Sequence, residues 1–474
     1  MTTLLLLILF AGLTLCLLSD DWKSGLLWTI AIGFCQDPIR KLTPGQPSLM
    51  VGLVLAAFLM CAFAVYQTRR QFDLKYLFWT SPQLFDLVPF FALLLVAQSV
   101  NSFARFASPP LILIGASFYI APAIALWMGF HIGRDLNCLR HIIFAYFLLS
   151  CVFAFTVLLD FQGVDIPLFK EVGGGILITF EGGSKSGASG FWRTSEIASW
   201  HLSAAACLSI VLAFSCRDAG KQILYLLMAV VFSVISVTTG RRKAQVLIVA
   251  FLGIYLLVFS RQASPASRER LILSVLGGIG ISYALVSMVL LDLLGSNYGI
   301  FLERAFTSKD ELGMRVKTQG IDAFLGAFEV GGGFGLGLGA GTNLGNFNAG
   351  ANRGAIRSLG YVSEGGGGRL IVELGIPGML LIGWMLLVSL QLAWRNFRLM
   401  QLLPSEEIAL LMGCLSFGLA NLFFFFSAAQ LYGDPFILVV LGICIGPILS
   451  IPVLVYTRRL QQQQSNSAVA RGLP

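Results

Sequence analysis

Apolar runs of roughly twenty residues recur along the whole chain, and most are long enough for an α-helix to cross the hydrocarbon core of a bilayer. The alternating strands of about ten residues that build outer-membrane barrels are missing. Because lipid offers the backbone no hydrogen-bond partners, helices must span instead. The pattern predicts an all-α polytopic membrane protein with about 12–13 transmembrane helices. The second run is short and is either a thirteenth crossing or a re-entrant half-span. The runs are 3–19, 22–36, 48–66, 84–103, 109–130, 141–160, 197–215, 221–239, 244–260, 271–294, 369–394, 407–427 and 433–457.

The composition agrees with this fold class. Hydrophobic residues make up 57% of the chain and charged residues only 12%, whereas soluble domains carry about 25% charged residues. Soluble enzymes, nucleic-acid binders and disordered scaffolds are therefore excluded. The net charge of +8 is typical of basic cytoplasmic loops, so we expect membrane lipids and no nucleic acid among the partners.

The distribution of Lys and Arg predicts the orientation of the chain. If the C-terminal tail is cytoplasmic, sixteen basic residues fall on the inner side and six in the short outer loops. This bias places both long loops, 161–196 and 295–368, on the outer side. The predicted organisation is then N-terminal helices (1–160), an outer loop (161–196), helices (197–294), a large glycine-rich periplasmic loop (295–368), C-terminal helices (369–457) and a cytoplasmic tail (458–474).

The large loop begins with an amphipathic pattern. Met314, Ile321 and Phe328 recur every seven residues along 309–330. This spacing predicts a helix with one apolar face, lying on the membrane surface or capping the bundle. A packed lid and a substrate-contacting helix are both compatible with the pattern.

Glycine dominates the rest of that loop, with 15 of the 38 residues from 331 to 368. No Lys-Ser/Thr follows for a P-loop and no strand precedes it for a dinucleotide fold. Glycine permits close backbone approach and exposes N–H groups that can surround an anion. A flexible connector is the alternative. The acidic and basic residues across 295–368 balance, six of each, so any anion site there must be local.

A short outer turn carries Arg241, Arg242 and Lys243 in succession. Three cations at this position run against the positive-inside bias, and such placement indicates a binding partner or a function. A structural salt bridge or an inverted topology are the alternatives.

The motifs of the outer side resemble those of the bacterial O-antigen ligase and O-antigen polymerase superfamily, polytopic transferases of lipid-linked glycans. Five stretches carry the resemblance over roughly residues 190–390, and they place family arginines on Arg193, Arg242 and Arg315 and the family glutamate on Glu373. The stretches are GFWRTSEIASWHLSAAA, SVTTGRRKAQVL, ERAFTSKDELGMRVKTQGIDAF, GGFGLGLGAG and GRLIVELGIPGMLLIGW. Ligases of the family carry His-Asn nine residues before the glutamate, whereas here that position is Glu364.

The resemblance implies transfer of a glycan from undecaprenyl diphosphate to an acceptor hydroxyl of a glycan or lipid, at the periplasmic face of the bacterial inner membrane. Arg242 and Arg315 would stabilise the diphosphate as the glycosidic bond breaks, and Glu364 would accept the hydroxyl proton. An ordinary salt bridge from Glu364 to Arg369 or Arg357 is the alternative. We expect no metal and no cofactor. The expected substrate-binding residues are Arg241, Arg193, Arg353, Arg357 and Glu373, the last by orienting an arginine.

Two other classes of function fit a polytopic chain with outward arginines. A lipid-linked glycan transporter or flippase should place ionisable residues near the middle of the membrane, whereas here they cluster at the ends of the runs. A non-catalytic component of a polysaccharide assembly complex is the third reading. A chain-length regulator or a flippase would be a natural partner of a polymerase. The sequence leaves ligase and polymerase, the sugar and the acceptor open.

Overall fold

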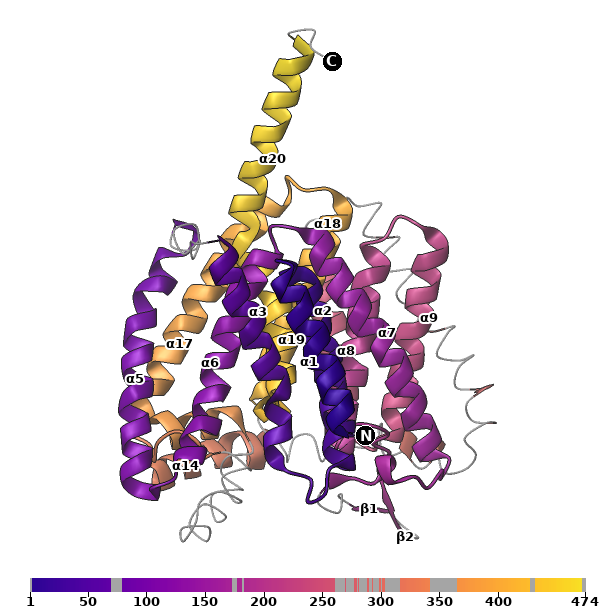
Figure 1. The fold of residues 1–474 in the computed structure, drawn as a ribbon, viewed down its shortest axis with the longest axis vertical. Helices are drawn as coiled ribbons and strands as arrows, with labels where there is room; N and C mark the ends of the chain where they lie inside the picture. Colours follow the sequence, from indigo (N-terminus) through magenta and orange to yellow (C-terminus); the bar gives the residue numbers. More distant parts are fainter. Residues whose placement is uncertain are drawn as a thin grey trace.

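The protein is a bundle of helices that stand side by side, most of them running the full height of the molecule (Figure 1). The computed structural model describes residues 2–69, 79–172, 177–180, 183–260, 316–341, 365–426 and 431–470, with a few helical residues between 269 and 302. The long helices are α1 (Thr2–Leu18), α2 (Trp22–Leu42), α3 (Leu53–Arg69), α5 (Pro82–Phe106), α6 (Pro109–Ile132), α7 (Leu136–Phe161), α8 (Ser195–Phe214), α9 (Ala219–Thr238), α10 (Arg242–Ser260), α17 (Gly366–Met400), α18 (Ser405–Phe425), α19 (Pro435–Ile445) and α20 (Pro447–Ala470).

Short elements connect these helices. Strands β1 (Leu177–Phe180) and β2 (Gly183–Ser186) pair antiparallel in a small hairpin. Helix α14 (Ala323–Gly331) follows a π-helical turn, η4 (Val316–Asp322). Three 3₁₀ turns complete the described structure, namely η1 (Ser48–Gly52), η2 (Pro167–Phe169) and η6 (Leu431–Gly433).

The expectation of an all-α polytopic membrane protein is confirmed. Among the described residues, ten helical segments are long and apolar enough to cross a membrane. Helices α19 and α20 together supply one of them, Pro435–Gln461, and α1 adds a shorter apolar helix. The expected span at 271–294 lies almost entirely outside the described residues.

The second apolar run proves longer than the sequence suggested. Helix α2 is continuous over 21 residues and runs antiparallel to α1 (Figure 1), but it is not among the ten segments that can cross a membrane, so a full crossing and a re-entrant half-span both stay predictions. Its last turns carry Asp37, Arg40 and Lys41, which ended the apolar run in the sequence. Each of these side chains has a partner inside the protein, so the helix continues through them.

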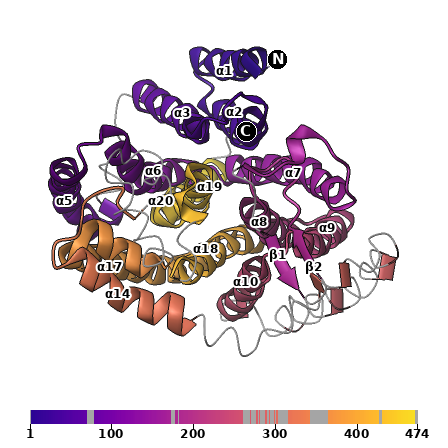
Figure 2. The ribbon, with the colours of Figure 1, turned by 90° about the horizontal axis from the view of Figure 1, so that it is seen from below.

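The two ends of the bundle differ. The N-terminus, the β1–β2 hairpin and α14 lie at one end, which we call the loop end, and the C-terminal part of α20 projects from the other, the tail end (Figure 1). The described parts of both long loops therefore emerge at the same end. Seen from below, α14 lies on its side along α17, while the spans are viewed along their axes (Figure 2).

The predicted amphipathic helix is present in part. Residues 309–315 lie outside the described structure, and α14 begins only at Ala323. Its buried side is formed by Ala323 and Ala327, which face α17, whereas Ile321 and Leu325 are more than half exposed. The predicted helix across the end of the bundle is confirmed, but its packed face is offset from the seven-residue stripe, since the π-helical turn shifts the register.

Helix α8 is a buried helix of the bundle, and its first residue lies at the loop end. It is surrounded by α7, α9, α10 and α18 (Figure 2), and 94% of its spanning segment is buried. A helix rich in small residues, such as Ala204–Ala206, permits this close packing. Its first residue, Ser195, is thereby held at a fixed position at the loop end.

Candidate functional site at the loop end

The three outward cations lie in the turn between α9 and α10, which we call the arginine turn (Thr239–Lys243). Gly240 adopts φ +68°, a left-handed conformation that favours glycine. Arg241 donates from Nε and Nη2 to the Ser195 hydroxyl, each at 3.3 Å. The expectation that Arg241 and Arg242 lie at the end from which both loops emerge is therefore met.

The backbone of the arginine turn packs against residues 187–188, near the end of the first long loop. A Cβ on Gly187 would stand 2.1 Å from the Thr239 carbonyl oxygen, so this contact tolerates no side chain. The Ala188 N–H donates to the Thr238 carbonyl at 3.2 Å. Backbone contacts thus hold the turn in addition to the Arg241–Ser195 hydrogen bonds.

Two carboxylates lie close to the arginine turn and to the start of α8. Lys243 Nζ lies 3.7 Å from Glu196 Oε1. The Glu171 carboxylate accepts a hydrogen bond from the Ser195 N–H. The N-termini of α8 and α10 meet here as well, and helix N-termini attract anions.

A cavity of about 380 Å³ adjoins the arginine turn. It lies between the end of α7 and the segment after β2, and Gly187 belongs both to its lining and to the contact with the turn. Its charged lining is mainly acidic: Asp160, Asp165 and Glu171 against Lys170. Carboxylates in such a hollow can accept hydrogen bonds from hydroxyl groups.

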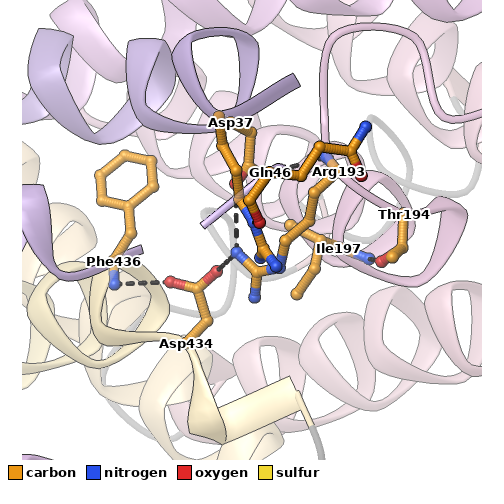
Figure 3. Close-up of polar contacts among 8 residues, drawn as sticks. Asp37, Gln46, Arg193, Thr194, Ile197, Asp434 and Phe436 are labelled. Carbon is orange, nitrogen blue, oxygen red and sulfur yellow. Dashed lines mark hydrogen bonds and ion pairs between the residues drawn. The ribbon is translucent and has the colours of Figure 1, made fainter. Parts of the chain in front are cut away.

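Arg193 occupies a different environment from the arginine turn. Its Nη1 lies 3.2 Å from Asp37 Oδ1 and 2.6 Å from Asp434 Oδ2, and its backbone N–H also donates to Asp37. Figure 3 shows the guanidinium between the two carboxylates. Burial lowers the pKa of this group, but Asp434 and Asp37 more than offset that effect and raise it above its ordinary value.

The position of Arg193 makes it a clamp. It joins α2, the end of the first long loop and the start of α19, three segments that are far apart in the sequence. Two carboxylates balance its charge and that of the neighbouring Arg40. The predicted role of Arg193 in substrate binding stays a prediction. In the structure, its contacts hold three segments of the chain together.

Glu373 is the centre of a second buried network. Its side chain is fully buried and accepts hydrogen bonds from the Tyr119 hydroxyl at 2.7 Å, the Gly341 N–H at 3.1 Å and Arg369 Nε at 3.3 Å. The expectation that Glu373 orients an arginine agrees with this geometry, and that arginine is Arg369. With three donors on its two oxygens, Glu373 is poorly placed to accept a substrate proton.

Arg369 links the two networks. Its guanidinium lies 3.6 Å above the ring of Phe118, and the residue is 3% exposed. Within the described part of the chain, its Nη2 has no hydrogen-bond partner. A Cβ on Gly433 would stand 3.8 Å from Nη1, so Arg369 borders the 3₁₀ turn that leads into Asp434 and the Arg193 clamp.

The glycine motif that follows α14 packs against the bundle. Gly335, Gly337 and Gly339 all have positive φ, and a Cβ on Gly337 would stand 2.4 Å from the Ser102 nitrogen of α5. The intervening Leu338 is fully buried. The N–H groups at 336, 338, 340 and 341 donate to protein acceptors. The expected close backbone approach is present, and in this segment its partner is the protein itself.

Four predicted site residues lie outside the described residues, and their placement stays untested: Arg315, Arg353, Arg357 and Glu364. In the described part of the chain, no group of three or more His, Cys, Asp or Glu side chains is arranged to hold a metal ion. Asp37, Tyr119 and Asp434 were missed by the sequence analysis. A carboxylate inside or beside a predicted span was the available signal for the two aspartates.

The fold defines a multi-pass all-α membrane protein with buried ionic networks at its loop end. No protein-family model matches the chain, and no curated protein matches it.

Proposed function

We propose that the protein transfers a glycan from a lipid diphosphate to an acceptor hydroxyl at the loop end of the bundle. The donor in this proposal is an undecaprenyl-diphosphate-linked glycan, and the product is an extended or ligated polysaccharide. The membrane is the bacterial inner membrane, with the loop end in the periplasm. The resemblance of the motifs around Arg242, Gly335 and Glu373 to the O-antigen ligase and polymerase superfamily motivates the choice of reaction.

The observation that carries the proposal is the arginine turn. Its cations are presented by backbone contacts at the meeting point of two helix N-termini. A lipid diphosphate brings its anionic group to the membrane boundary, where these span ends lie. Arginine offers a planar, permanently charged fork that matches phosphate oxygens. In the reaction, the acceptor oxygen bonds to the anomeric carbon, the bond from that carbon to the diphosphate breaks, and Arg241 and Arg242 stabilise the departing charge.

The adjoining acidic cavity supplies a place for sugar. A glycan attached to a diphosphate held at the turn would extend across Gly187 toward Asp165 and Glu171, whose carboxylates bind hydroxyl groups. In the same proposal Glu364 accepts the acceptor proton, and Arg315, Arg353 and Arg357 contribute from the large loop. The Arg193 and Glu373 networks hold the surrounding spans.

The test is transfer by the purified protein in lipid nanodiscs. Arg241→Gln and Arg242→Gln should each weaken binding of undecaprenyl diphosphate and reduce polymer formation by about 10–100-fold, since a hydrogen bond to a charged group contributes about 1.5–3 kcal/mol. Arg459→Gln is the matched control, because Arg459 is an exposed cation of α20 at the tail end.

Three results of these measurements would contradict the proposal. Normal transfer in both turn variants would remove the arginine turn from the reaction. Movement of labelled lipid-linked glycan across the bilayer without any new glycosidic bond would establish the transporter class instead. A protein that does neither, yet is required for polymer in cells, would belong to the non-catalytic assembly components.

A further inference from the structure

A second cavity, of about 680 Å³, lies at the tail end, opposite the arginine turn. It is formed where α7, α9 and α18 begin and where α8 ends. Nothing in the proposed reaction uses this cavity. Its charged lining consists of Arg140, His141, Arg217, Lys221, Glu406 and Glu407.

Both carboxylates of this cavity form an ion pair, although the buried Glu407 Oε2 has no hydrogen-bond partner in the described residues. Glu406 accepts from Arg217 Nε at 2.6 Å and from Arg217 Nη2 at 3.3 Å. Glu407 is paired with Arg458 of α20. Two cations, Arg140 and Lys221, remain in excess of these pairs.

Neither of these two cations forms a close ion pair in the described residues, although Arg140 interacts with Glu406 at longer range. Within the ranges that the structure describes, no acidic oxygen lies within 4 Å of the Arg140 guanidinium or of Lys221 Nζ. The buried Nε of Arg140 also has no hydrogen-bond acceptor there. With Arg458 counted, four cationic side chains face two carboxylates, and this balance favours an anionic occupant.

The wall of the cavity changes character with depth. On α7, Phe144 lies four residues after Arg140, and on α9, Tyr225 lies four residues after Lys221. Residues four apart share one face of a helix, and one turn corresponds to about 5.4 Å. Each of two helices thus presents a cation near the tail end and an aromatic ring one turn further along the span, and the Phe144 ring is 38% exposed.

We propose that this cavity binds the headgroup of an anionic phospholipid from the leaflet at the tail end. Arg140 and Lys221 hold the phosphate, while Phe144 and Tyr225 contact the glycerol and the first methylenes of the acyl chains. A free phosphate would use the cations but not the aromatic wall, and the apolar depth of the cavity favours the lipid.

The test is lipid retention by the full-length protein, measured by native mass spectrometry after release from detergent containing phosphatidylglycerol. Arg140→Gln/Lys221→Gln should reduce phosphatidylglycerol occupancy by about 30-fold, since each cation near a lipid surface contributes roughly fivefold. Arg398→Gln/Arg459→Gln removes the same charge from exposed positions of α17 and α20 and should leave occupancy unchanged.

The source of the phosphate is tested separately. Phosphatidylcholine and glycerol 1-phosphate should both be retained at least tenfold less than phosphatidylglycerol, and Phe144→Ser should weaken the lipid alone. Equal binding of glycerol 1-phosphate would overturn the lipid assignment. An equal loss in both double variants, or no loss in either, would overturn the site itself. If the double variant fails to fold, Lys221→Gln alone replaces it in the comparison of lipid occupancy. Lys221 is exposed, so this single change should not affect folding.

Discussion

Replacement of Glu373 by glutamine tests the energetic role of the buried network at the start of α17. The change keeps the size of the side chain but removes the charge that faces Arg369. The arginine would then remain 3% exposed beside a neutral amide, and the amide nitrogen would face one of the three present donors. Removing one partner of a buried ion pair costs about 3–5 kcal/mol.

The expected result is a lower melting temperature in detergent. A chain of this length loses about 2 °C per kcal/mol or somewhat less, so Glu373→Gln should melt roughly 5–10 °C below the wild type. Size-exclusion chromatography after heating, followed by tryptophan fluorescence, measures this. Glu329→Gln is the matched control, because Glu329 is an exposed carboxylate of α14 at the same end.

A double variant separates charge from shape. Arg369→Met/Glu373→Gln removes the stranded cation while the thioether keeps a contact with Phe118, so it should recover at least half of the lost melting temperature. If Glu373→Gln melts within about 1 °C of the wild type, the buried ion pair does not stabilise α17. If the double variant is no better than the single one, hydrogen-bond geometry rather than charge is decisive.

Three further substitutions address other parts of the loop end. Gly337→Ala should reduce folded yield severalfold, because Gly337 has a positive φ and an added Cβ would clash with the Ser102 backbone. Gly383→Ala should be neutral, because nothing lies within 4 Å of that position in the middle of α17. Equal yields of the two variants would contradict the packing of the glycine motif. Arg193→Gln should lower the melting temperature by several degrees, because it leaves two buried carboxylates unpaired; an unchanged melting curve would contradict the clamp. Thr194→Ala removes the N-cap of α8 and should cost about 1 kcal/mol, visible as a shift of about 2 °C in the same assay, and no shift would show that packing alone positions α8.

The membrane architecture was largely predictable because apolar run length is a local property of the sequence. The limits of α5, α6 and α9 lie within a few residues of the predicted runs. Helix α2 was underestimated for a physical reason. Its last turns carry Asp37, Arg40 and Lys41, which look like the end of a span unless their partners are known, and Arg193 follows Asp37 by 156 residues.

The candidate site was predictable only in part. The arginine turn was recognisable because three consecutive cations on an outward turn are conspicuous in the sequence alone. The partners of Glu373 were not, since Tyr119 is 254 residues away and a tyrosine in an apolar run carries no signal of its own. The glycine motif showed the need for close approach, but its partner, the α5 backbone near Ser102, is specified only by tertiary packing.

The loop end combines two kinds of positive charge with different consequences. Arg193 and Arg369 lie against carboxylates in buried networks that join spans, so their charges are balanced locally. The arginine turn is held by backbone contacts at 187–188 and by the Arg241–Ser195 hydrogen bonds, and it lies at two helix N-termini. Substitutions in the buried networks should therefore lower the amount of folded protein, with transfer per folded molecule little changed. Substitutions at Arg241 or Arg242 should lower transfer far more than yield, because the backbone contacts at 187–188 hold the turn when one of those side chains is replaced. Measuring yield and turnover together on both sets separates the support of the site from the site itself.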